Sequence, residues 1–231
     1  FFIDCGNPPP DNFAKYYQAG CLAFELISNK QKIICNSGYG KYLSPKLNAI
    51  SRSTAAHSTL YLNDTSSCIF QKNKAINEVY GNSLLQKHKV ISKNYTEDKD
   101  FYNITASHNG YEKEFGYIHT RSIKILKNKD KIFGQDKLKK TRNNLNSLAY
   151  FIRFHIYPNN KIVKTKAQNS VLISLSNGEG WLLKSEKNNF EIEKSIFMGN
   201  KSKIINNESV SISGSINEEL IVLSWEIERI N

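Results

Sequence analysis

The residues best suited to chemistry in this sequence begin with an arginine and a histidine in its first third. Arg52 and His57 flank a run of small residues, and an alternating apolar segment begins at Leu60, so His57 would stand at the mouth of a strand. A guanidinium binds a carboxylate through two parallel hydrogen bonds, and an imidazole exchanges protons near neutral pH. Alternatively, Arg52 pairs with Asp64, and His57 is a hydrogen-bonded structural imidazole.

Two tyrosines and a second histidine offer further polar groups. Tyr39 and Tyr42 lie in a glycine-rich loop, where a phenol could act as a general base or simply cover the surface. His108 lies in the turn Ser-His-Asn-Gly-Tyr, where its ring could face a cleft or stabilise the turn. The local sequence leaves both interpretations of each residue open.

The segments that must position these residues alternate between apolar and polar side chains. This period of two is typical of β-strands, and helical periodicity is hard to find. Clear examples are 22–26, 32–35, 59–62, 122–126, 151–156 and 209–213. The sequence therefore predicts an all-β fold in which residues 1–231 form one domain, a large antiparallel two-sheet β-sandwich or supersandwich. We expect Trp181 and Trp225 to lie in strands and to be at least half buried.

Composition and charge exclude several classes of protein. With 39% hydrophobic and 11% aromatic residues, the chain is too apolar to be disordered, and no apolar run approaches the roughly 18 residues of a membrane span. The net charge of +11 comes mainly from lysine. The lysine-rich stretch 121–142 lacks the interleaved arginines and aromatic rings expected for nucleic acid. We interpret it as a solvated hairpin edge, with polyanion binding through charge alone as the alternative.

Several short motifs follow one another in an order typical of a known family. Residues 52–59 resemble the arginine, small residues and His-(Asn/Ser)-Thr that enter a strand in the C-terminal β-sandwich of heparinase II/III-like polysaccharide lyases. Residues 18–26 are similar to that family's His-x-Asp-x-Leu-Ser-Phe segment, and 33–38 to its turn with an aspartate and a glycine near a tyrosine. Three later segments resemble motifs of its bacterial members, at 106–111, 115–121 and 152–158. The resemblance is colinear and spans most of the chain.

The resemblance implies a two-part enzyme in which the sandwich follows an N-terminal (α/α) toroid that is absent from this sequence. Substrate would lie in the cleft between the two parts, and the sandwich would form one wall. Such lyases cleave uronate-containing acidic polysaccharides, of glycosaminoglycan or alginate-like type, by β-elimination. A base removes the proton next to the uronate carboxylate while that carboxylate is neutralised. The resemblance also implies a periplasmic location, and we expect the isolated sandwich to be inactive.

Carried over position by position, the resemblance also implies the residues of the site. His57, Tyr42 and Tyr39 would be the catalytic candidates, and Arg52 and His108 would contact the substrate. The alternative function is a non-catalytic carbohydrate-binding or structural β-sandwich derived from the same family.

The family's zinc ion would fall on Gln18, Asn36 and His57. Two of these three side chains are neutral amides, which are poor Zn²⁺ ligands compared with imidazole nitrogen or carboxylate oxygen. We therefore expect a degenerate metal site with little zinc, and no other cofactor. The amides at Gln18 and Asn36 also favour the non-catalytic alternative.

Overall fold

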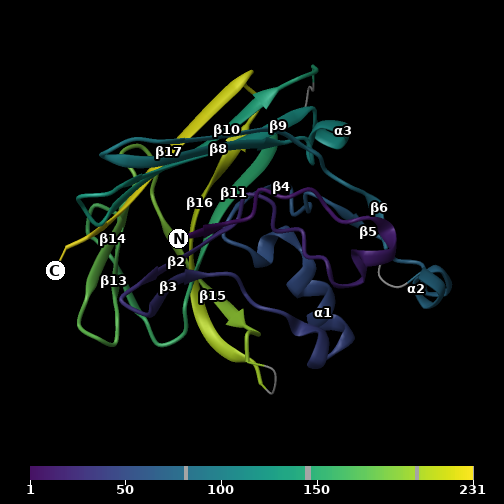
Figure 1. Ribbon diagram of the computed structural model, residues 1–231, viewed down its shortest axis with the longest axis horizontal. Coiled ribbons are helices and arrows are strands. Elements are labelled where there is room, and N and C mark those ends of the chain that lie inside the picture. The colour runs from purple at the N-terminus through teal and green to yellow at the C-terminus, as the bar shows by residue number, and fades with distance from the viewer. Residues whose placement is uncertain (81–82, 144–146, 201–202, 231) are drawn as a thin grey trace.

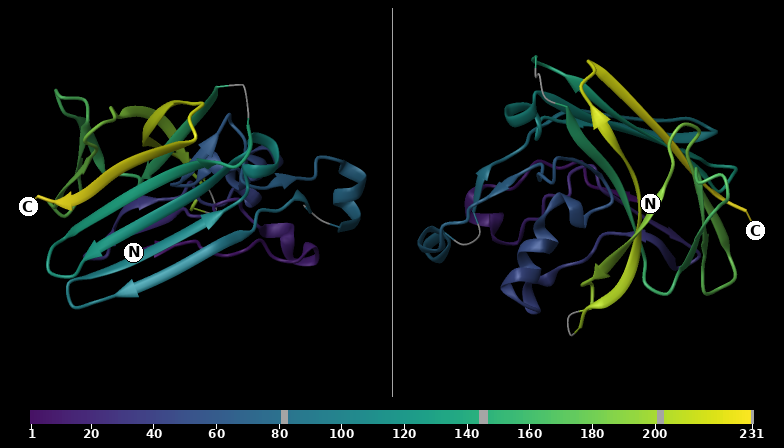
Figure 2. Two further views of the ribbon diagram at one scale, coloured as in Figure 1. Left: turned by 90° about the horizontal axis from the view of Figure 1, so that it is seen from above. Right: turned by 180° about the vertical axis from the view of Figure 1, so that it is seen from behind.

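Two large antiparallel sheets face each other in the computed structural model (Figures 1 and 2), which describes residues 1–80, 83–143, 147–200 and 203–230. In spatial order, the 7-stranded sheet contains β1 (Phe2–Ile3), β2 (Phe24–Ser28), β3 (Gln31–Cys35), β11 (Leu148–Ile156), β16 (Ile205–Ile216) and β15 (Glu191–Phe197), with β4 (Leu60–Leu62) paired to β11. The 8-stranded sheet contains β12 (Lys161–Lys164), β13 (Ser170–Ser174), β14 (Gly180–Lys184), β17 (Leu220–Arg229), β10 (Lys131–Lys140), β9 (Tyr117–Leu126), β8 (Phe101–His108) and β7 (Val90–Glu97). The predicted all-β sandwich is confirmed.

Helical elements are short and connect the strands. They are η1 (Asp11–Tyr16), η2 (Gly40–Tyr42), α1 (Pro45–Arg52), η3 (Thr54–Ala56), α2 (Lys74–Tyr80) and α3 (Glu112–Phe115). Two further strands, β5 (Ile69–Phe70) and β6 (Leu84–Gln86), form a separate small sheet. In Figure 1, α1 and α2 lie at one end of the molecule, and β13 and β14 lie at the other. The described part of the chain holds no helix that is long and apolar enough to cross a membrane.

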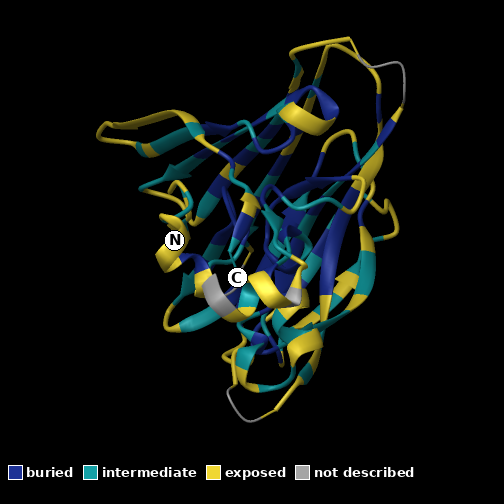
Figure 3. Ribbon diagram, turned by 90° about the vertical axis from the view of Figure 1, so that its right-hand side faces the viewer, coloured by how far each residue is buried: buried dark blue, intermediate teal, exposed yellow. Residues whose placement is uncertain are grey.

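The core lies between the two sheets and follows from the alternation along each strand. In β17, for example, Leu223, Trp225 and Ile227 are buried, whereas Ser224 between them is exposed. The ring of Trp225 stacks on Phe24 of the opposite sheet, with centroids 5.4 Å apart. Gly134 of β10 pairs with Trp225 and leaves room for its ring, because a Cβ at this position would lie 2.1 Å from the ring. Figure 3 shows buried residues along the strands and exposed residues at the hairpin ends.

Both tryptophans lie where the sequence predicts. Trp181 in β14 and Trp225 in β17 are 3% and 2% exposed, and both belong to one large hydrophobic cluster that draws on both sheets. A buried tryptophan contributes about 3–5 kcal/mol relative to alanine. The two rings are therefore major contributors to the stability of the sandwich.

The lysine-rich stretch 121–142 is not at an edge of the sheet, which corrects that part of the prediction. It forms the hairpin of β9 and β10, and β8 and β17 flank this hairpin on its two sides. Arg121 points into the core and is fully buried, whereas Lys124 and Lys137 lie on the outer face. A hairpin inside a sheet needs no lysines to protect its edge, so these cations serve to solvate an open face.

Helix α1 is the longest described helix, and the local sequence marks where it begins. Ser44 caps it, since its Oγ accepts the Leu47 N–H at 3.1 Å, and Pro45 occupies the first turn. Serine and proline are favoured at these two positions. Through η3, the end of α1 leads directly to His57 and then to β4. This segment positions Arg52 and His57, two of the residues that the family motifs single out.

Candidate functional site

His57 follows η3 and lies in the interior, with 4% of its surface exposed. Its Nδ1–H donates to the Ser53 carbonyl at 2.8 Å. Gly20 permits this placement, because a Cβ at Gly20 would lie 2.6 Å from the ring. Burial lowers the pKa of His57 to about 4, so the ring is neutral at neutral pH. In this position His57 fixes the loop between α1 and β4.

Arg52, the last residue of α1, is also buried. Its Nε donates to the Tyr17 carbonyl at 2.8 Å, and a terminal nitrogen donates to the Ala14 carbonyl at 3.0 Å. The guanidinium lies 4.1 Å from the centroid of the Phe70 ring. Burial lowers its pKa to about 10, which leaves it charged. Arg52 thus ties η1 and the residue that follows it to α1.

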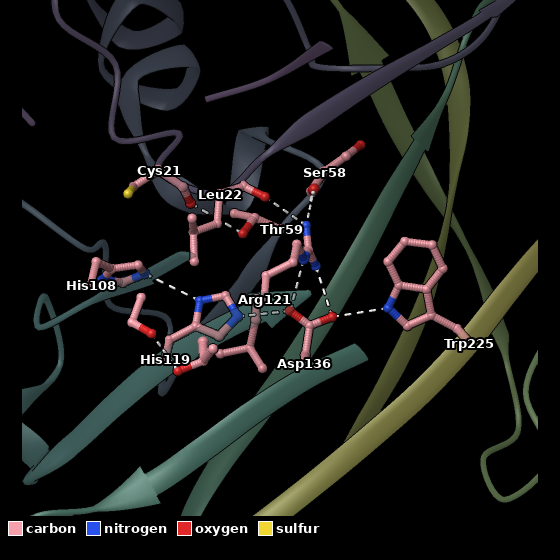
Figure 4. A network of polar contacts seen from close by, with 12 residues as sticks. Cys21, Leu22, Ser58, Thr59, His108, His119, Arg121, Asp136 and Trp225 are labelled. Atoms are coloured by element: carbon pink, nitrogen blue, oxygen red, sulfur yellow. Dashed lines mark hydrogen bonds and ion pairs between the residues drawn. The ribbon is translucent and has the colours of Figure 1, made fainter. Parts of the chain in front are cut away.

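His108, at the end of β8, is 1% exposed and belongs to a buried hydrogen-bond relay (Figure 4). Its Nδ1 accepts the Gly110 N–H at 3.1 Å, so its Nε2–H donates to Nδ1 of His119 at 3.1 Å. The Nε2–H of His119 then donates to Asp136 Oδ1 at 2.7 Å. This assignment of tautomers satisfies both rings in their neutral form, and burial lowers the pKa of each.

The relay ends on a buried ion pair between β9 and β10. Arg121 donates from Nε to Asp136 Oδ1 at 2.8 Å and from Nη2 to Oδ2 at 3.0 Å. Trp225 Nε1 donates to Oδ2 at 2.9 Å, and Nη1 of Arg121 reaches the carbonyls of Leu22 and Ser58. We call His108, His119, Arg121, Asp136 and Trp225 the core network. Its members are all buried and lie in the 8-stranded sheet, and Arg121 connects that sheet to the loops that precede β2 and β4.

The three positions aligned with the family's zinc ligands do not fit a zinc ion. Gln18 Nε2 donates to the carbonyls of Gly38 at 3.1 Å and Ser51 at 3.0 Å. Asn36 Oδ1 accepts the Ser58 N–H at 2.9 Å. Both amides therefore cross-link neighbouring loops, which leaves His57 as the single strong ligand type of the three. Among the described residues, no group of three or more His, Cys, Asp or Glu side chains is arranged to hold a metal.

Tyr39 and Tyr42 lie at η2, where the structure brings them together with residues of η1. Lys41 Nζ lies 3.8 Å from the centroid of the Tyr16 ring and 5.4 Å from that of Tyr42. The edge of Tyr39 meets Tyr16 at a centroid distance of 6.4 Å. We call Lys15, Tyr16, Tyr39, Lys41 and Tyr42 the tyrosine–lysine patch. Tyr16 and Tyr42 are 52% and 65% exposed, so their phenols are open to a ligand.

The patch combines groups that can move a proton with groups that can neutralise an anion. The ammonium group of Lys41, close to the Tyr16 ring, lowers the pKa of Tyr16, and the charge of Lys15 acts in the same direction. The hydroxyl of Tyr39 is buried and has no hydrogen-bond partner among the described residues. Burial raises the pKa of Tyr39, which keeps that phenol protonated. The arrangement offers one acidified phenol and two ammonium groups on a surface that also carries the exposed phenol of Tyr42.

The sequence motifs led to Tyr39 and Tyr42 but not to Tyr16. Tyr16 lies two residues before Gln18, where the first family motif begins. Tyr39 is 23 positions further along the chain, so the local sequence around Tyr16 gives no sign that the rings of Tyr16 and Tyr39 meet. The contact arises because Arg52 and Gln18 hold η1 against the segment that carries η2. A search for Lys-Tyr pairs beside the motif would have singled out Tyr16, although not its contact with Tyr39.

The comparisons agree with this fold. The chain matches the family described as "Heparinase II/III-like, C-terminal" over residues 1–226. A heparan sulfate lyase HepC from Pedobacter heparinus is similar in structure, with a TM-score of 0.72 and 14% identity over 93% of this chain and 31% of that chain. A heparinase III has a TM-score of 0.66 and 13% identity over 92% of this chain and 30% of that chain.

These similarities show how much of its relatives the chain covers and to which family it belongs. It spans about a third of the length of the solved lyases that it resembles, and no curated protein sequence matches it. The match to the family covers nearly the whole chain, and the structural likeness extends over the same two sheets. This chain belongs to the heparinase II/III-like C-terminal family.

Proposed function

We propose that this sandwich forms one wall of the substrate cleft of a polysaccharide lyase and that the tyrosine–lysine patch faces an acidic, uronate-containing glycan. The observation that carries the proposal is the contact of Lys41 with Tyr16 on an open surface beside the first family motif. A toroidal domain of the same protein would form the opposite wall. The heparan sulfate lyase that this chain resembles makes heparan sulfate the first substrate to test.

The patch suits the two demands of β-elimination. Lys15 and Lys41 neutralise the uronate carboxylate, so that the proton on the adjacent carbon becomes more acidic. In its deprotonated form, which the neighbouring lysines favour, Tyr16 takes that proton, the electron pair forms a carbon–carbon double bond, and the bond from the next carbon to the glycosidic oxygen breaks. Tyr42 then gives a proton to the leaving oxygen. Atoms and charge balance without a cofactor.

The buried candidates have supporting roles in this proposal. Arg52 holds the carbonyl of Tyr17 and thereby positions Tyr16, while His57 fixes the loop that leads away from α1. His108 lies in the core network and links β8 to β9 through its hydrogen bond with His119. These residues are positioning residues, because each acts through another part of the chain rather than by touching the glycan.

The test is turnover of heparan sulfate by the full-length protein, followed through the ultraviolet absorbance of the unsaturated product. We expect Tyr16→Phe to reduce turnover by about 10²-fold, the usual contribution of a positioned acid or base. Tyr95→Phe is the matched control, because Tyr95 is also exposed but lies on β7. Equal turnover in the Tyr16→Phe variant and the control would contradict the proposed role of the patch.

A non-catalytic carbohydrate-binding sandwich is the second candidate function. The neutral amides at Gln18 and Asn36 favour it, because the family's metal-binding chemistry is lost at those positions. In that case heparan sulfate would bind without forming product, and Lys41→Met would weaken binding while Lys161→Met, on β12, would not. Measuring both product formation and binding on the same protein samples therefore distinguishes the two functions.

A further inference from the structure

The 8-stranded sheet ends on a long strand whose outer side is open. Within the described structure, β7 is the last strand of this sheet and pairs with β8 alone. With 8 residues, it is longer than β1, β12 and β15, the strands at the other ends of the two large sheets. Residues 91–97 are all exposed, and the hairpin of β7 and β8 lies at the margin of the molecule (Figure 2, left). An exposed edge of this length is a template for pairing with another strand.

The hairpin's hydrogen bonds show which backbone groups of β7 are free. The Asp98 N–H donates to the Phe101 carbonyl at 3.1 Å, where the two strands meet at the turn. In an antiparallel pair, bonded and non-bonded residues alternate, so every second residue of β7 from Asp98 onwards bonds to β8. The residues between them are Lys93, Tyr95 and Glu97. Their N–H and C=O groups point away from the sheet and form no hydrogen bond within the described residues.

The free part of the edge has defined limits. At its start the Val90 N–H donates to Oδ1 of Asn7 at 2.7 Å, and the register then shifts between Val90 and Ser92. At its other end the chain turns back into β8 after Asp98. Between the Asn7 side chain and this turn, the edge offers room for one added strand.

The side chains of the three free residues alternate with the remainder of β7 and therefore share one face. Lys93 forms no ion pair within the described residues. The carboxylate of Glu97 accepts the Tyr95 hydroxyl at 2.9 Å and pairs with Lys127 at 2.6 Å. The edge thus carries a cation and an anion at equal distances on either side of an exposed tyrosine.

This pattern is complementary to itself when a second copy of β7 runs antiparallel to the first. With Tyr95 opposite the partner's Tyr95, Lys93 lies opposite the partner's Glu97 on both sides of the axis. An axis at Lys93 or at Glu97 would instead place two lysines or two glutamates opposite each other. Opposite charges and aromatic rings stabilise such cross-strand pairs, and like charges destabilise them. The free backbone groups and the charges therefore select the same register.

We propose that two copies of this chain associate through β7 about a two-fold axis at Tyr95, so that their 8-stranded sheets join into one continuous sheet. Tyr95 exchanges backbone hydrogen bonds with the partner's Tyr95, and Lys93 does so with the partner's Glu97. One added strand covers less than the roughly 1,600 Å² of a standard interface, so we expect a reversible dimer with a dissociation constant on the order of 10 μM. The tyrosine–lysine patch has no part in this contact, so the inference is independent of the proposed function.

The test is sedimentation velocity of the full-length protein over a range of concentrations, which measures the dissociation constant of the dimer. Lys93→Glu and Glu97→Lys each place like charges opposite one another twice, so each should weaken the dimer about tenfold or more. Both change exposed side chains, so both variants should fold. Lys161→Glu, on the edge strand β12 of the same sheet, is the matched control and should leave the dissociation constant unchanged.

Mixing the two charge variants provides the decisive measurement. In the mixed dimer the new glutamate of one variant faces the new lysine of the other, and the remaining Glu97 faces the remaining Lys93. We therefore expect the mixture to dimerise at concentrations at which each variant alone is monomeric. A parent protein that stays monomeric at every concentration, a dimer that both charge variants leave intact, or a mixture that dimerises no better than its components would overturn the proposal.

Discussion

The core network and the tyrosine–lysine patch use their polar groups in opposite ways. In the core network, both histidine rings are neutral and hydrogen-bonded, and the carboxylate of Asp136 accepts from three side chains. In the patch, Tyr16 and Tyr42 are exposed, so their hydroxyls are open to a ligand. Satisfied polar groups hold a fold together, whereas open ones remain available to a ligand. Exposure and free hydrogen-bonding capacity therefore identify the candidate site better than residue type.

All five histidines of the chain are buried, as the residues of the core network are. His57, His88, His108, His119 and His155 are each buried, with exposed fractions of 4% or less. Histidine is the residue type that most often suggests proton-transfer chemistry in a sequence. Here the exposed polar groups of the candidate site are Tyr16, Tyr42 and their neighbouring lysines, and the imidazoles serve as hydrogen-bonding units of the interior.

The largest expected difference between the two regions is their response to acid. Burial lowers the pKa of all five histidines in the fold, to about 4 for His57 and about 3 for His155. The unfolded chain therefore binds more protons below about pH 6.5, so the free energy of unfolding falls as the pH drops from 6.5 towards 4, by up to roughly 1.4 kcal/mol per pH unit for each histidine. Urea unfolding at several pH values would measure this loss. A constant stability between pH 7 and 4.5 would contradict the buried, neutral state of the rings.

Asp136 titrates in a different and lower range. Although burial alone would raise the pKa of this carboxyl, Arg121 and His119 hold it well below its usual value. Its stabilising contribution is therefore present above about pH 3.9, the value of the unfolded chain, and is lost only below it. The acid sensitivity between pH 6.5 and about 5 thus belongs to the histidines and not to Asp136.

Removal of a charge from the core network should have the next largest effect. Asp136→Ala would leave Arg121 buried and without its counterion, which typically costs about 3–5 kcal/mol. Chemical denaturation measures the loss directly. Asp130→Ala is the matched control, because Asp130 forms an exposed ion pair with Arg229 and such pairs contribute about 0–1 kcal/mol. Similar losses in both variants would show that the core network contributes less to the free energy of unfolding than its geometry indicates.

His57→Ala should have an intermediate effect on stability. The substitution removes the hydrogen bond to the Ser53 carbonyl and opens a space against Gly20, so we expect a loss of about 1–3 kcal/mol. Turnover per folded molecule should stay within a few-fold of the parent protein. A melting temperature that hardly changes together with a turnover reduced about 10²-fold would instead make His57 a catalytic residue.

Substitutions in the tyrosine–lysine patch should have the smallest effect on stability. The double variant Lys15→Met/Lys41→Met changes one exposed and one partly exposed side chain, so we expect the free energy of unfolding to stay within about 0.5 kcal/mol. Binding to heparan sulfate should weaken and should depend less on salt, because surface charges act through a screened field. Unchanged affinity and salt dependence would show that the glycan binds elsewhere. Lys137→Met/Lys161→Met, with two lysines of the 8-stranded sheet, is the matched control for the lost charge.

The alternation of apolar and polar residues was sufficient to predict the sandwich and the burial of both tryptophans. In β17 every second residue faces the core, and Trp225 falls on that face. The colinear motifs predicted the family, which the match over residues 1–226 establishes. Helix α1 was not predicted because it is short, although Ser44 and Pro45 mark its start. The position of the β9–β10 hairpin inside the sheet was also missed, because no local pattern shows which strands will flank a hairpin.

What the sequence determined by itself is which side chains share a face of a strand, since that depends only on the period of two residues. What those side chains meet was decided by the tertiary structure. The register of β9 on β10 sets Arg121 opposite Asp136 and brings His119 within 2.7 Å of the same carboxylate. The packing of η1 against η2 brings Tyr16 to Lys41 and Tyr39. Both arrangements depend on strand register or on loop packing, which the period of two residues does not determine, so they arise only when the chain folds.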